Sequence, residues 1–159
     1  MLFRSHEYPF DKQKILDRRI NYSCRSWLAD VPEIYSNRAP GNTCLSALSA
    51  QKSGKGLAND YVKEPQNRSK GCGGIMRVAP VALNYKRVEM DTLDMEGAQI
   101  AAITHGHSLG YMPAAIVTHI INRIVFGEKK KTLNNIVIEA RDKVAEIFRG
   151  DKHLKALTD

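Results

Sequence analysis

The sequence predicts an all-α protein. Apolar residues recur with helical spacing along most of the 159 residues, and no stretch alternates with the period of two that a half-buried strand requires. The composition, 43% hydrophobic and 26% charged, is that of a globular protein. The chain has no internal repeat, and no linker separates two apolar regions. We therefore expect residues 1–159 to form a single helical domain.

The helices are expected over residues 11–31, 42–51, 91–104, 111–126 and 132–148. The first is predicted from a one-faced apolar stripe between Ile15 and Val31, on which Trp27 is interpreted as a core residue. The last is the clearest, because Thr132 suits its N-cap and Gly150 suits the position after its C-terminal end.

The charge balance favours an anionic partner. Lys and Arg number 24 against 17 Asp and Glu, which gives a formal charge of +7 and makes phosphate the first candidate. Apart from the run Lys129–Lys131, the basic residues are scattered, a pattern more typical of a solvated surface than of a nucleic-acid interface. We do not expect nucleic acid to be the partner.

Cysteine usage and hydropathy predict a cytoplasmic protein. The three cysteines form no C-x-x-C pair and are odd in number, so neither a disulfide framework nor a structural zinc site is expected. The N-terminus has no apolar core of signal-peptide length. Residues 111–126 are apolar but are interrupted by His119, Asn122 and Arg123, so no membrane span is expected.

A glycine cluster is the first candidate for a binding site. Residues 53–69 are polar, basic and without periodicity, so they predict a long loop, and loops of this length are often functional. This loop leads into Ser69-Lys70-Gly71-Cys72-Gly73-Gly74 and then into the apolar run Ile75–Leu83. Glycine amides ahead of a helix can bind an anion, to which Lys70 and Arg77 could add charge. The alternative is a tight turn where two helices cross; the spacing matches neither the Walker loop nor the Rossmann fingerprint.

A second candidate is Thr104-His105-Gly106-His107-Ser108-Leu109-Gly110-Tyr111, between two expected helices. Its histidines could bind a metal ion, donate to a phosphate or ribose, or cap the two helices. A metal site needs further ligands, His119 is the only other histidine nearby in the sequence, and no suitably spaced carboxylate accompanies it. We therefore predict no metal site. A third motif, Arg38-Ala39-Pro40-Gly41-Asn42-Thr43, reads by itself as a turn followed by a helix cap.

Taken together and in this order, the three motifs resemble those of the ADP-ribosylglycohydrolase family. The resemblance covers about residues 22–148. It implies an all-α fold and cleavage of the glycosidic bond between ADP-ribose and a protein side chain or a related acceptor, with two Mg²⁺ ions. The implied partner is ADP-ribose or an ADP-ribosylated substrate.

The resemblance also implies which residues bind the substrate. The glycine-rich segment, residues 69–74, would hold the diphosphate and the adjacent ribose, and the histidine of the Thr-His pair would contact the same region. The residues so implied are Ser69, Gly71, Cys72, Gly73, Gly74 and His105. Some members have Asn at the position of Cys72, so the contact expected there is through the backbone.

The metal-binding motifs of the family are not found in this sequence. Members carry a Thr-Asp-Asp motif upstream of the matching region and a second Asp-rich motif downstream, whereas no Asp-Asp pair occurs in these 159 residues. We therefore expect an internal fragment, an incomplete helical bundle with no catalytic residue and no Mg²⁺ ligand, which does not hydrolyse ADP-ribose conjugates alone. The alternative is a non-catalytic relative that binds ADP-ribose or serves as a structural protein.

Overall fold

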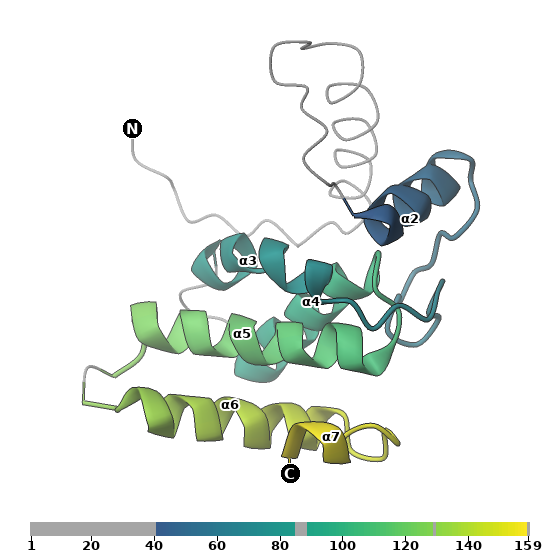
Figure 1. The fold of residues 1–159 in the computed structure, drawn as a ribbon. Coiled ribbons are helices and arrows are strands. Elements are labelled where there is room, and N and C mark those ends of the chain that lie inside the picture. Colours follow the sequence, from purple (N-terminus) through teal and green to yellow (C-terminus); the bar gives the residue numbers. More distant parts are fainter. Residues whose placement is uncertain (1–40, 85–88, 129, 159) are drawn as a thin grey trace, which may run out of the picture.

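The computed structural model describes residues 41–84, 89–128 and 130–158, and within them all regular structure is helical (Figure 1). The elements are α2 (Asn42–Lys52), the 3-10 helix η2 (Cys72–Arg77), α3 (Ala79–Asn84), α4 (Met90–Ala102), α5 (Ser108–Phe126), α6 (Leu133–Ile147) and α7 (Lys155–Thr158). The all-α prediction is confirmed. The helix expected over residues 11–31, with Trp27, lies outside the described ranges.

Helix α5 lies at the centre of the described fold. It packs against α3 and α4 on one side and against α6 on the other, as Figure 1 shows. Met112, Ala114 and Ala115 of α5 are fully buried. By length and composition α5 is the one described helix that could cross a membrane, but its buried residues and its packing partners are those of a core helix.

A close approach of backbones fixes the crossing of α4 and α5. A Cβ atom added at Gly97 of α4 would lie 2.2 Å from Oγ1 of Thr118 in α5. The Thr118 hydroxyl is fully buried and donates to the carbonyl oxygen of Ala114 at 2.8 Å. Only glycine fits at position 97 without moving one of the two helices.

A cluster of polar side chains, partly buried, joins three helices. Asp94 of α4 and His119 of α5 are both 0% exposed, and Oδ2 of Asp94 lies 2.8 Å from Nδ1 of His119. On the opposite edge of the imidazole ring, Nε2 lies 3.7 Å from Oε1 of Glu139 in α6. Arg123 and Lys131 also pair with Glu139, at 2.9 and 2.8 Å. This cluster, the His119 cluster, ties α4, α5 and α6 together.

The predicted ends of the last long helix are confirmed. The Thr132 hydroxyl accepts a hydrogen bond from the amide of Asn135 at 3.3 Å, which makes Thr132 the N-cap of α6. After α6, Gly150 adopts a φ of 96°, a left-handed conformation that favours glycine.

Two boundaries differ from the prediction. Helix α5 begins at Ser108 rather than Tyr111, because the side chain of His107 caps it. The apolar run Ile75–Leu83 is not one element: it begins in η2, passes through the C-cap Val78 and ends in α3. The glycines therefore do not precede a helix as predicted. Gly73 and Gly74 lie within η2, and Gly71 is its N-cap.

Candidate functional site

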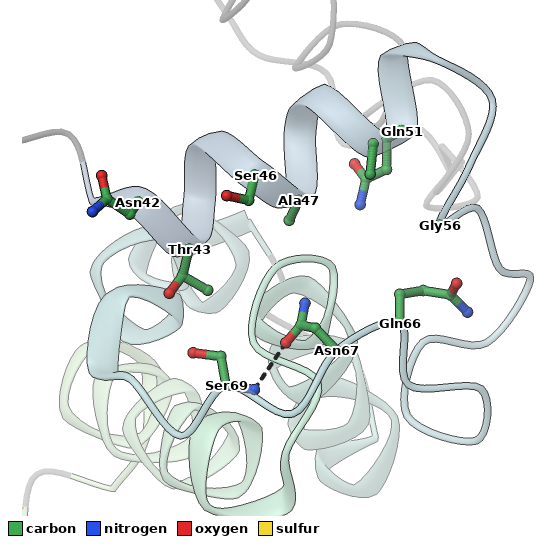
Figure 2. Close-up of a pocket in the computed structure, with 10 residues that line it drawn as sticks. Asn42, Thr43, Ser46, Ala47, Gln51, Gly56, Gln66, Asn67 and Ser69 are labelled. Atoms are coloured by element: carbon green, nitrogen blue, oxygen red, sulfur yellow. Dashed lines mark hydrogen bonds between the residues drawn. The ribbon is translucent and has the colours of Figure 1, made fainter.

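A pocket of about 470 Å³ lies between α2 and the loop of residues 56–69 (Figure 2). Among the residues that the structure describes, its walls carry hydroxyl and carboxamide groups from both sides and no charged side chain. The polar lining residues are Asn42, Thr43, Ser46 and Gln51 from α2, and Gln66, Asn67 and Ser69 from the loop. Such a lining offers hydrogen bonds to neutral polar groups of a ligand.

Asn67 holds the loop in place below this pocket. Its Oδ1 accepts from the amides of Ser69 and Gly106, both at 3.0 Å, and its Nδ2 donates to the carbonyl oxygen of Thr104 at 3.0 Å. One side chain thus ties the start of the glycine-rich segment to the Thr104–His107 turn. Asn67 was not predicted as a site residue; its one signal in the sequence was an Asn in a polar loop, a residue type that often bonds to nearby backbone.

The glycine-rich segment curves around Ser69. The amide of Gly71 donates to Oγ of Ser69 at 3.3 Å, and Gly71 and Cys72 are exposed. From Cys72 the backbone turns into η2, and the first amides of such a helix have no partner within it. On the inner side, a Cβ atom at Gly74 would lie 2.7 Å from Cβ of Ala101, so α4 lies directly beneath the segment.

His105 supports the segment from below. It is 3% exposed, and a Cβ atom at Gly73 would lie 2.9 Å from its Cε1. Its Nδ1 lies 2.8 Å from Oγ1 of Thr104. Burial and the nearby charge of Arg77 lower the pKa of His105 below its ordinary value, which favours the neutral ring. His105 is therefore a packing surface for the glycines.

Arg77 points inward, which corrects the expectation that it adds charge to the glycine-rich segment. Its guanidinium donates to the carbonyl oxygens of Ile100 and Ala101, both at 3.2 Å, and to the hydroxyl of Thr104. These carbonyls lie in the last turn of α4, where a cation is favoured. Lys70, in contrast, is exposed.

His107 has the capping role that was one of the three interpretations of its motif. Its Nδ1 accepts from the amide of Leu109 at 3.1 Å, at the N-terminus of α5. The histidine beside it is His153, whose ring centroid lies 4.4 Å away, whereas His119 belongs to the buried His119 cluster. Sequence distance alone pointed to His119 as the neighbour.

Of the six residues that the sequence analysis assigned to substrate binding, Ser69 lines the pocket. Gly71, Cys72, Gly73 and Gly74 continue from it along one segment, and His105 packs against two of these glycines. The structure thus brings all six together, with His105 beneath the surface and the pocket beside Ser69.

No group of three His, Cys, Asp or Glu side chains that could hold a metal ion occurs within the described ranges. These residues do not themselves provide the carboxylate set that Mg²⁺ prefers. Cys44 and Cys72 are free thiols, and Cys24 lies outside the description.

Comparison with known proteins agrees with the motifs. The family profile described as ADP-ribosylglycohydrolase matches residues 1–159. Searches of curated proteins and of solved structures each gave no match. The profile spans the whole sequence, including the glycine-rich segment and the Thr104–Tyr111 motif. The chain belongs to the ADP-ribosylglycohydrolase family.

Proposed function

We propose that this chain binds the ADP-ribosyl group of a conjugate at the pocket between α2 and the loop of residues 56–69. It would thereby supply the ADP-ribose-binding part of the hydrolysis of ADP-ribosyl linkages. The observation that carries the proposal is that Ser69, the first residue of the glycine-rich motif, also lines the pocket. One ligand can therefore reach the exposed glycine-rich segment and the pocket together.

The glycine-rich segment suits the diphosphate of such a ligand, and the pocket suits its ribose and base. Arg68 and Lys70 flank Ser69 and are both exposed, so they supply positive charge for a diphosphate near the exposed Gly71 and Cys72. The carboxamides and hydroxyls of the pocket match the hydroxyls of a ribose and the polar edge of a base. The net charge of +7 favours the approach of this anion.

We further propose that these 159 residues bind without hydrolysing. Water activation in this family depends on carboxylate-held magnesium, and the sequence contains no Asp-Asp pair. The described residues contribute no cluster that would replace it. The residues present therefore support binding and orientation of the ligand.

Calorimetric titration of the chain with ADP-ribose, with and without magnesium, tests both parts of the proposal. We expect saturable binding that magnesium does not change, together with no release of ADP-ribose from an ADP-ribosylated protein. Absence of binding would contradict the binding proposal and favour a structural role. Magnesium-dependent release by the purified chain would contradict the second part alone.

A further inference from the structure

The cap of α5 is a titratable side chain. Because Nδ1 of His107 accepts a hydrogen bond from the amide of Leu109 at 3.1 Å, that nitrogen must carry a lone pair. A second proton on the ring would turn Nδ1 into a donor facing another donor. The cap therefore exists only while His107 is neutral, unlike the Ser, Thr, Asn or Asp caps that are usual at this position.

A second histidine faces the first. The ring of His153, from the turn between α6 and α7, lies 4.4 Å from that of His107, with an angle of 40° between the planes. That turn is held by Asp151, whose Oδ1 accepts from the amide of His153 at 2.8 Å. The contact joins the N-terminus of α5 to the C-terminal part of the described chain.

The backbone of His107 also holds the glycine-rich segment. Its amide donates to the carbonyl oxygen of Ser69 at 3.3 Å. The same carbonyl lies against Gly110, where an added Cβ atom would come within 2.8 Å of it. The residue that caps α5 is thus also bonded to Ser69, which lines the pocket.

The charges around His107 disfavour a second proton. The electrostatic effects of Lys70 in the glycine-rich segment, and of Lys152 and His153 in the turn after α6, lower the pKa of His107, while that of Asp151 in the same turn raises it. Burial, then His153 and Lys70, lower the pKa of His107 below its ordinary value.

We propose that His107 and His153 form a pH-sensitive latch, which holds the start of α5 and the glycine-rich segment against the turn after α6 while the ring of His107 is neutral, and which releases them on acidification. The proposal does not depend on ADP-ribose being the ligand of the pocket. It rests on the cap, the ring contact and the bond to Ser69.

The direction of the pH dependence follows from linkage. The pKa of His107 is lower in the folded chain than in the unfolded chain, so the unfolded chain takes up the proton first. The contribution of the latch to stability is complete above the unfolded pKa of about 6.5 and is lost as the pH falls below it. His105, whose pKa is also lowered, acts in the same direction, so a global stability measurement would mix the two.

Hydrogen exchange of the Leu109 amide isolates the latch from His105. We expect its protection, corrected for the intrinsic exchange rate, to fall by roughly threefold or more between about pH 7.5 and about pH 5.5. In the His107→Asn variant, a carboxamide oxygen keeps the cap but does not titrate, so the protection should not change over this range. Equal losses in the wild type and in His107→Asn would overturn the proposal.

The His153→Phe variant gives an independent readout if His107→Asn does not fold. It keeps a ring beside His107 and removes the electrostatic effect of His153 that lowers the pKa of His107. NMR titration of the His107 ring should show a higher pKa in this variant than in the wild type. An unchanged His107 titration would mean that the two rings are not coupled, and the latch would be rejected.

Discussion

At the scale of single residues, the glycine-rich segment keeps its position through close contacts on its inner side. Gly73 packs against the ring of His105, and Gly74 packs against Ala101 in α4. The contact at Gly73 is with a side chain, whereas the Cα of Ala101, 3.1 Å from a Cβ atom at Gly74, belongs to a helix backbone. The two glycines therefore differ in how much a methyl group would disturb.

We predict that Gly74→Ala destabilises the chain by about 1–3 kcal/mol, because the added methyl group forces the segment away from α4. Urea denaturation of the variant and the wild type measures this difference. Lys70→Ala, at an exposed position of the same segment, is the control and should change the free energy of unfolding by less than about 0.5 kcal/mol. Equal stability of Gly74→Ala and the wild type would show that the segment does not pack on α4 as described.

At the scale of helices, local signals decided how much could be predicted. The ends of α6 followed from its Thr132 cap and apolar periodicity, and α4 was placed to within two residues. The start of α2 was predicted from the turn before it, but the expected side-chain cap was wrong, because the N-cap is Gly41 and no side chain caps the helix. The early start of α5 was missed, because histidine is not a usual cap and its bond to Leu109 is visible only in three dimensions.

The candidate site was predicted less completely than the helices. Motifs identified the segment from Ser69 to Gly74 and its neighbour His105, but they gave no sign of the inward turn of Arg77 or of the role of Asn67. Both depend on contacts with residues that are more than 20 positions away in the sequence. Sequence spacing carries no information on which distant carbonyl oxygen a side chain will reach.

The cap of α6 gives a test at this scale. Thr132→Ala removes the acceptor for the amide of Asn135 and should lower the free energy of unfolding by about 1 kcal/mol, whereas Thr132→Asn keeps an acceptor and should lower it by only a few tenths. Thermal denaturation of the wild type and the two variants gives the order of their stabilities. A loss in Thr132→Asn as large as that in Thr132→Ala would show that the cap bond does not contribute.

At the scale of the whole described fold, the His119 cluster is a buried polar connection between α4, α5 and α6. Asp94 and His119 are removed from water, and the bond to His119 satisfies Oδ2 of the Asp94 carboxyl group. We predict that His119→Ala costs about 3–5 kcal/mol, because it leaves the Asp94 carboxylate buried without its partner.

The double variant Asp94→Leu with His119→Met is the matched comparison for this prediction. It removes both polar groups and refills the volume, so it should recover much of the stability that His119→Ala loses. Denaturant titration of the single and double variants gives the values. A double variant no more stable than His119→Ala would mean that the lost packing, and not the unpaired carboxylate, causes the loss.

The central claim is that the pocket beside Ser69 receives the ADP-ribosyl group, and a bulky side chain inside the pocket tests it most directly. Ala47→Phe introduces a ring from the wall that α2 forms (Figure 2). Ser49→Phe adds the same ring at an exposed position of the same helix. In calorimetric titrations with ADP-ribose, we predict that Ala47→Phe weakens binding by about tenfold or more and that Ser49→Phe binds like the wild type. Unchanged affinity in a folded Ala47→Phe variant would contradict the assignment of the pocket.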